Sequence, residues 1–106
     1  MKLILPILVA ALLHAAPVHA DCDKVQAREV VEAFTSSGMA SREESGITVW
    51  YHWRGPWHTM GRDKQMRLIH GLAAVEHCLR PGVTTRIRFS GKDVARGNAQ
   101  GVQIIE

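Results

Sequence analysis

Residues 47–58 read ITVWYHWRGPWH and contain all 3 tryptophans and the single tyrosine of the 106-residue chain. Up to Trp53, apolar residues alternate with Thr48, Trp50 and His52, and this period of two is typical of a β-strand. The Arg-Gly-Pro run that follows is a strand breaker. The stretch therefore predicts a strand that ends at Trp53.

The chain after this break predicts a helix and a second strand. Residues 62–79 carry an apolar stripe at the spacing of an amphipathic helix, formed by Leu68, Leu72, Val75 and Leu79. A Pro-Gly pair ends the helix, and alternating apolar and basic residues predict a strand over 83–89. A helix of this length, about 27 Å, can return the chain beside the first strand, so we expect the two strands to be parallel.

The flanking segments add smaller elements. Asp23 begins a predicted helix over 24–37, and the polar residues 39–45 are expected to be a connector. A predicted hairpin turn at 90–93 leads into a short strand at 94–96. A loop at 97–101 and a final strand at 102–105 complete the prediction.

The first twenty residues have the order of a secretory signal peptide. A lysine precedes an apolar run, and small residues precede a cleavage site near Ala20. The apolar run of about eleven residues is shorter than the roughly twenty that a membrane span needs. Asp21 disfavours acylation of the neighbouring Cys22. We therefore expect a removed signal over 1–20, a single small domain over 21–106, no membrane span, and a periplasmic or secreted protein.

The 2 cysteines, Cys22 and Cys78, are expected to form a disulfide, because exported proteins enter an oxidising compartment. Bridged Cα atoms lie within about 7 Å, so the start of the first helix must approach the end of the second. The sequence therefore predicts an α+β, two-layer sandwich. Its two helices pack on one face of a small mixed sheet of about three to four strands.

Alternation along the strands divides their side chains between the two faces of this sheet. The face under the helices is expected to hold Ile47, Val49, Tyr51, Trp53, Val83, Thr85, Ile87 and Phe89. The other face is expected to hold Thr48, Trp50, His52, Thr84, Arg86 and Arg88. Trp57 is expected to pack where the second helix begins.

Trp50 is then an aromatic residue on a polar, basic face. Tryptophan and arginine are enriched at binding hot spots, so we predict a binding surface at Trp50, His52, Arg86 and Arg88. The predicted function is a non-catalytic binding or accessory domain that contacts a protein or an anionic envelope ligand. Two alternatives remain, both with arginine stems stacked on the ring: the chain's own loop or C-terminal segment covers Trp50, or a second copy does so in a homodimer.

Metal handling is the alternative function. Met66, His70 and His77 share one side of the predicted second helix, and imidazole and thioether groups both suit copper. Histidines two turns apart are separated by about 10 Å, so one ion would need a third element to bridge them. The common zinc spacings are absent, and solvated surface histidines are the simpler interpretation. No cofactor is expected.

The sequence offers little for catalysis or for nucleic acid binding. Glu43 and Glu44 are adjacent in the predicted connector, and the expected disulfide consumes the thiol of Cys78. A net charge of +3 is only mildly basic, and no aromatic RNA-binding motif is present. We expect neither an enzyme nor a nucleic acid partner.

Overall fold

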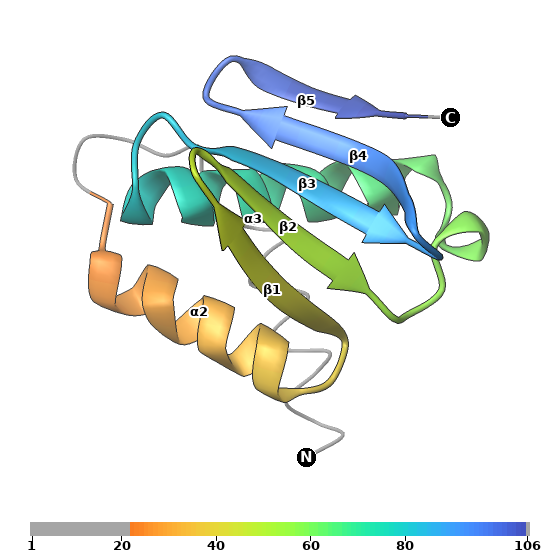
Figure 1. The fold of residues 1–106 in the computed structure, drawn as a ribbon, viewed down its shortest axis with the longest axis horizontal. Helices are drawn as coiled ribbons and strands as arrows, with labels where there is room; N and C mark the ends of the chain where they lie inside the picture. The colour runs from red at the N-terminus through yellow and green to blue at the C-terminus, as the bar shows by residue number, and fades with distance from the viewer. Residues whose placement is uncertain (1–21, 106) are drawn as a thin grey trace.

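Helices and sheet form two layers in the computed structural model, which describes residues 22–105 (Figure 1). In chain order the elements are α2 (Lys24–Ser36), β1 (Ala40–Ser45), β2 (Thr48–Trp53), η1 (His58–Met60), α3 (Arg62–Leu79), β3 (Thr84–Phe89), β4 (Lys92–Asn98) and β5 (Gly101–Ile104). The predicted signal peptide lies outside the described residues, as do both ends of the predicted domain. The α+β class is confirmed, but the mixed sheet has 5 strands, more than the three to four expected.

β2 and β3 run parallel and are joined by α3, as the sequence pattern predicts. The bounds of α3 coincide with those of the predicted helix. The register pairs Thr48 with Thr84 at one end and Trp53 with Phe89 at the other. The strand order is β1-β2-β3-β4-β5, and β1, β4 and β5 each pair antiparallel with their neighbours. The parallel pair thus lies inside the sheet.

The segment at 39–45 is not the expected connector, because most of it is the edge strand β1. A two-residue turn, Gly46-Ile47, joins β1 to β2, and the φ of 60° at its first position suits glycine. Ile47 is 71% exposed in this turn, so its expected place on the core face is also wrong. Only Ala40 in β1 is buried, and the strand therefore lacks the alternating apolar pattern that identifies strands in a sequence.

Of the two C-terminal strands, β4 is longer than predicted, and β5 has the predicted length but begins one residue earlier. The hairpin turn is Ser90-Gly91, and its φ values of 52° and 79° are those of a type I′ turn. β4 then extends from Lys92 to Asn98 rather than over 94–96. Asn98 pairs with Gly101, so the expected loop at 97–101 shrinks to a short turn between β4 and β5.

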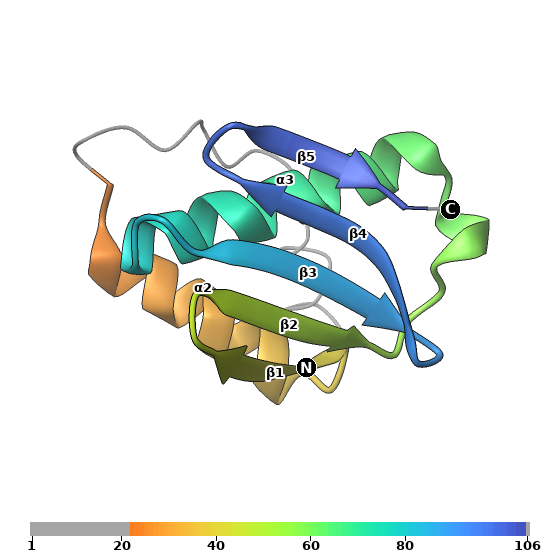
Figure 2. The ribbon, with the colours of Figure 1, turned by 45° about the horizontal axis from the view of Figure 1, so that its top comes forward.

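The predicted disulfide between Cys22 and Cys78 is present, with Cα atoms 5.9 Å apart. It links the start of α2 to the end of α3, and both helices lie on the same side of the sheet (Figures 1 and 2). Gly97 of β4 allows α3 to approach closely, because a Cβ atom there would lie 3.0 Å from the Cβ of Ala73. The other side of the sheet carries no helix of the described chain (Figure 2).

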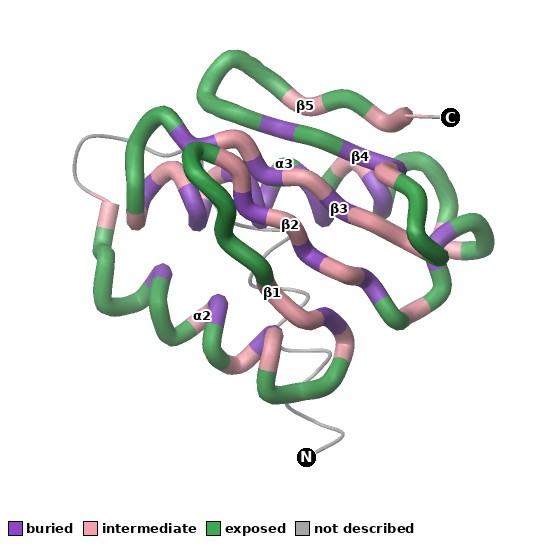
Figure 3. Tube along the Cα trace, viewed as in Figure 1, coloured by how far each residue is buried: buried purple, intermediate pink, exposed green. Residues whose placement is uncertain are grey.

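The core lies between the helices and the inner face of the sheet, defined here as the face toward α2 and α3 (Figure 3). Of the residues expected there, Val49, Tyr51, Trp53, Val83, Thr85 and Ile87 are buried and Phe89 is partly buried. Phe34 of α2 stacks on Trp53 with ring centroids 5.7 Å apart and meets Tyr51 edge-on. Trp57 is buried where α3 begins, as expected. Core packing therefore accounts for every tryptophan except Trp50.

Candidate functional site

The four side chains predicted for binding lie together on the outer face of the sheet, the face opposite the helices. The register of β2 and β3 places Trp50 beside Arg86 and His52 beside Arg88. These two pairs are two residues apart along each strand, so they are neighbours on one face. All four residues are partly exposed. The structure thus brings together the residues that the strand pattern singled out.

An arginine lies over the Trp50 ring, and no helix of residues 22–105 lies on this face of the sheet (Figure 2). The guanidinium carbon of Arg88 lies 5.6 Å from the centre of the Trp50 ring, which is cation–π geometry. The indole Nε1 of Trp50 is buried and has no hydrogen-bond partner among the described residues. An unpaired buried donor costs about 1–3 kcal/mol.

Asp93 of β4 positions the two arginines, and the sequence analysis missed it. Its Oδ2 accepts a hydrogen bond from Arg86 Nη1 at 3.0 Å, and its Oδ1 accepts one from Arg88 Nε at 2.9 Å. A register shift between Ile87 and Arg88 sets Asp93 opposite Arg88. The sequence placed Asp93 in a turn, and no local pattern reveals the shift that aims its carboxylate at β3.

His52 lies beside a carboxylate at the β1 edge of the outer face. Its Nε2 is 2.8 Å from Glu43 Oε1, and the two side chains are 35% and 59% exposed. Exposed pairs of this kind contribute at most about 1 kcal/mol, so the contact leaves His52 accessible to a partner. Glu43 was missed because its strand was expected to be a connector.

The outer face is hollowed over β3, β4 and β5. The cavity has a volume of about 510 Å³, which lies within the range of small-molecule sites. Its charged and polar lining includes Thr84, Arg86, Arg96, Asn98 and Gln103. Arg96 Nε donates to Gln103 Oε1 at 3.0 Å. Sequence reasoning did not include Arg96 in the site, because the predicted hairpin joined its strand to the strand over 83–89 but gave no register and did not assign Arg96 to a face of the sheet.

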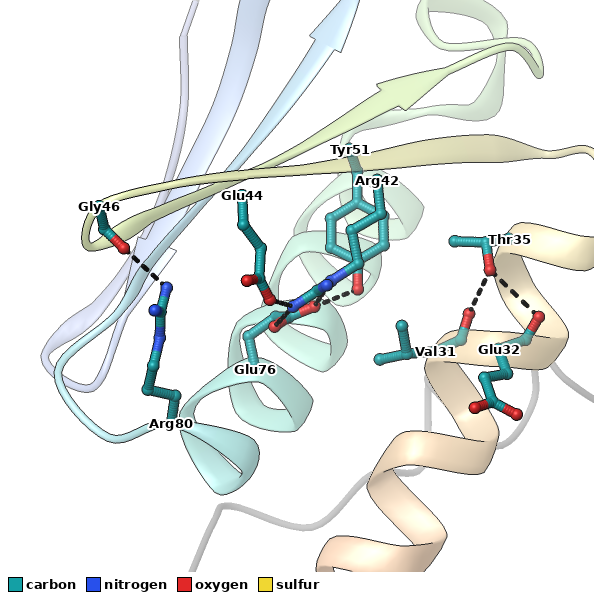
Figure 4. A network of polar contacts seen from close by, with 9 residues as sticks. All are labelled: Val31, Glu32, Thr35, Arg42, Glu44, Gly46, Tyr51, Glu76 and Arg80. Carbon is teal, nitrogen blue, oxygen red and sulfur yellow. Dashed lines mark hydrogen bonds and ion pairs between the residues drawn. The ribbon is translucent and has the colours of Figure 1, made fainter.

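A second polar cluster lies on the inner face, between α3 and the first two strands (Figure 4). The Glu76 side chain is 1% exposed, and its carboxylate accepts hydrogen bonds from Arg42 Nε at 2.7 Å and Arg42 Nη2 at 2.8 Å. The Tyr51 hydroxyl donates to the same carboxylate. Arg42 also donates to Glu44 Oε1 at 2.5 Å. We call these four residues the Glu76 cluster.

The contacts shift pKa values within the Glu76 cluster. The hydrogen bond to Glu76 raises the pKa of Arg42 above its usual range. Burial, followed by the charge of Glu76, raises the pKa of Tyr51 well above its usual range. The hydrogen bond from Arg42 lowers the pKa of Glu44. Arg42 therefore stays charged and Tyr51 stays protonated, and the cluster ties α3 to β1 and β2 rather than exchanging protons.

The sequence contained a signal for this cluster that went unused. Glu76 follows Leu72 by four residues and Ile69 by seven, so it lies on the apolar stripe of α3. An acidic residue at such a position is rarely buried unless it is paired. A buried acidic residue on the stripe therefore indicates a basic partner, and in the structure that partner is Arg42.

The residues of the metal alternative lie along α3. His70 is exposed, whereas Met66 and His77 are partly buried. His70 and His77 line a groove of about 160 Å³ beside the turn between β4 and β5, and the intervening Ala73 is buried. The Nδ1 atom of His77 is buried without a hydrogen-bond partner among the described residues. No group of three or more His, Cys, Asp or Glu within residues 22–105 is placed to hold a metal ion.

Comparison of the chain with protein-family models, with curated proteins and with solved structures gives no significant match.

Proposed function

We propose that this protein is a non-catalytic binding or accessory domain that contacts a protein or an anionic envelope ligand through the outer face of its sheet. The recognition residues are Trp50, His52, Arg86 and Arg88. All four carry hydrogen-bonding groups or a flat aromatic surface, and they form two adjacent cross-strand pairs. Tryptophan and arginine on a rigid sheet lose little conformational freedom on binding, which favours affinity.

One observation carries the proposal: Trp50 of β2 lies under Arg88, on a face of the sheet that no helix of the described chain covers (Figure 2). The other two tryptophans are buried in or beside the core. Trp50 instead lies on the outer face beside Arg88, whose side chain is 38% exposed and shares Asp93 with Arg86. A partner that covers the Trp50 ring and supplies a negative charge would complement both side chains.

The proposed location is the periplasm or the extracellular space. The charge and apolar pattern of residues 1–20 supports export, and the disulfide fits an oxidising compartment. No helix among the described residues has the length and apolar character of a membrane span. The mass of the exported protein tests this location, and we expect cleavage near Ala20. A chain that keeps its first twenty residues would contradict the proposed export.

The binding proposal is tested by capture from envelope extract. The wild type, a Trp50→Ala/Arg88→Ala variant and an Arg88→Gln variant are immobilised in equal folded amounts, and recovery of each retained component is measured by mass spectrometry. We expect at least one component to be reduced tenfold or more by both outer-face variants. Arg88→Gln leaves the Trp50 ring in place, so a loss with this variant does not depend on the fold of the double variant.

A matched control is available on α2. Val25 is an exposed apolar residue and Arg28 an exposed arginine on the layer opposite the outer face. Val25→Ala/Arg28→Ala removes similar groups and should leave recovery unchanged. Equal recoveries from the wild type and both outer-face variants would contradict the proposal. Retention of the chain itself, lost with Arg88→Gln, would identify a second copy as the partner.

Metal handling remains the second candidate, favoured by the groove that His70 and His77 both line. The unpaired Nδ1 of His77 is a ligand atom that copper or zinc accepts. Titration with Cu²⁺ or Zn²⁺, followed by NMR of the histidine rings, tests this function. We expect saturable shifts at both histidines if it is correct, and unshifted resonances would contradict it.

A further inference from the structure

The hollow on the outer face lies in the same row of side chains as Trp50. Trp50 pairs with Arg86, Arg86 with Arg96, and Arg96 with Gln103, so one row crosses β2, β3, β4 and β5. The hollow occupies the β3–β5 part of this row, with Thr84 and Asn98 also in its wall. It is therefore continuous with the recognition residues but made largely of different side chains.

Two arginines face each other across this hollow. Arg86 and Arg96 are directly opposite in the register of β3 and β4. Like charges in that position destabilise a sheet. Asp93 is hydrogen bonded to Arg86 and Arg88, whereas Arg96 is bonded to the neutral Gln103. The residues that line the hollow include no Asp or Glu, so its positive charge is only partly balanced.

The two amide side chains in the wall also present donors. Gln103 Oε1 accepts from Arg96 Nε, and Asn98 Oδ1 accepts from the backbone N–H of Gln100 at 2.9 Å. Both partners are obligate donors, so the amide atom that faces each of them is the oxygen. Each amide then retains an NH₂ group for another acceptor. Two guanidinium groups, two amide NH₂ groups and the Thr84 hydroxyl thus line one cavity.

We propose that this hollow binds the phosphate group of a phosphate ester. The proposal rests on the binding role proposed above and names the chemical class of the ligand. A carboxylate has two oxygens and is satisfied by one arginine fork, whereas a phosphate ester has more acceptor oxygens and more charge for two arginines and several neutral donors. The volume of about 510 Å³ exceeds that of a lone phosphate and leaves room for a polar esterified group. Binding also relieves the repulsion between Arg86 and Arg96.

NMR titration of the ¹⁵N-labelled protein, residues 21–106, in phosphate-free buffer tests this site. The probes are glycerol 3-phosphate, inorganic phosphate, and, as a neutral control, glycerol. The signals followed are the side-chain amides of Gln103 and Asn98 and the Nε–H of Arg96. We expect saturable shifts with glycerol 3-phosphate, at lower concentration than with inorganic phosphate, and no shifts with glycerol.

Two variants locate the site. Arg96→Gln removes one guanidinium and leaves Trp50 and the Asp93 contacts in place, and it should weaken glycerol 3-phosphate binding at least tenfold. Arg67→Gln changes an exposed arginine on α3 and should leave binding within twofold of the wild type. Because Arg96 is exposed and the only hydrogen bond of its side chain among the described residues is to Gln103, the variant is expected to fold. Equal binding by both variants would overturn the assignment.

Sedimentation with phosphatidylglycerol vesicles distinguishes the two sources of a phosphate ester. Arg96-dependent sedimentation identifies a lipid headgroup, and glycerol 3-phosphate binding without sedimentation identifies a soluble ester; each supports the phosphate site. Absence of saturable shifts with every phosphate probe would overturn it. So would tighter binding of a glutamate-rich peptide at the same signals, which would indicate an acidic protein.

These outcomes are separable from the test of the proposed function. If Arg88→Gln abolishes capture of an envelope component while no phosphate ester binds, the binding domain stands and its phosphate class is wrong. If phosphate binds at Arg96 while capture is insensitive to Trp50 and Arg88, the recognition residues proposed around Trp50 are wrong and the hollow alone is the site.

Discussion

The inner and outer faces of the sheet both carry arginines, but the arginines of the two faces differ in how they are paired with carboxylates. On the inner face, the Glu76 carboxylate meets Arg42 with two hydrogen bonds and also accepts from Tyr51. On the outer face, Arg86 and Arg88 share the single carboxylate of Asp93. Positive charge is therefore matched within the inner cluster and left in excess on the outer face.

This difference separates a structural cluster from a binding surface. Groups whose hydrogen bonds are already satisfied inside a protein gain little from a ligand, and breaking their contacts destabilises the fold. Groups with excess charge at the surface gain from a partner and cost little when removed. Variants of the inner face should therefore change stability, and variants of the outer face should change binding.

The largest effect is expected from Glu76→Gln, which removes the charge that pairs with Arg42 and keeps the shape of the side chain. Breaking a buried ion pair costs about 3 kcal/mol or more, and here Arg42 would keep only its contact with the exposed Glu44. Urea unfolding measures the loss. Glu29→Gln, on the exposed surface of α2, is the control and should change stability by less than about 0.5 kcal/mol. A loss below about 1 kcal/mol for Glu76→Gln would remove the distinction between the faces.

Because of the Tyr51 hydroxyl, the free energy of unfolding is expected to depend on pH in the alkaline range. Its pKa is raised in the folded protein, chiefly by burial, so the unfolded chain loses this proton first as the pH rises above about 10. The contribution to stability is present below that pH and falls by about 1.4 kcal/mol per pH unit above it. Unfolding of the wild type and Tyr51→Phe is compared between about pH 9 and 11. The stability advantage of the wild type should shrink with pH, and parallel curves would contradict the assignment.

On the outer face, Arg88→Ala should cost about 0.5–2 kcal/mol, less than Glu76→Gln. It removes a cation–π contact of about 0.5–1 kcal/mol and one partly exposed ion pair, neither of which supports the core. Urea unfolding measures this cost. Acrylamide quenching of tryptophan fluorescence gives a second readout, because Arg88→Ala uncovers Trp50 while Trp53 and Trp57 remain buried. A cost as large as that of Glu76→Gln would mean that Arg88 holds the fold.

The smallest effect, and the one with opposite sign, is expected from Arg96→Gln. This change removes the like charge opposite Arg86 and should raise stability by about 0.2–0.5 kcal/mol in low salt. The gain should decline as salt screens the repulsion. Urea unfolding at two ionic strengths checks both statements. A destabilisation of the free protein would show that Arg96 is already balanced without a ligand.

Local patterns predicted most of the fold. The leucine stripe and the Pro-Gly pair fixed both ends of α3, and the alternation around Trp50 identified β2 and its two faces. The disulfide was predictable because only two cysteines are present. β1 was not predicted as a strand, because it carries polar residues such as Arg42 and Glu44. Glu76, the partner that makes such a strand favourable, lies on a helix that is distant in the sequence.

The candidate site was predicted only where one strand pattern was sufficient. Trp50 and Arg88 follow from alternation within β2 and β3. Asp93 depends on a register shift, and Arg96 depends on the pairing of β4 with both of its neighbours. Such pairings join residues through the assembled sheet, and the residue types along any one strand do not specify them.

The most direct test compares the reactivity of individual arginines toward phenylglyoxal, read by mass spectrometry, with and without envelope extract. We predict that Arg88 and Arg96 react in the free protein and are protected at least fivefold by the extract. Arg42 should remain unreactive in both conditions, and Arg28 on α2 should react equally in both. Protection of Arg28 instead of Arg88 and Arg96, or no protection at all, would contradict the assignment of the outer face as the binding surface.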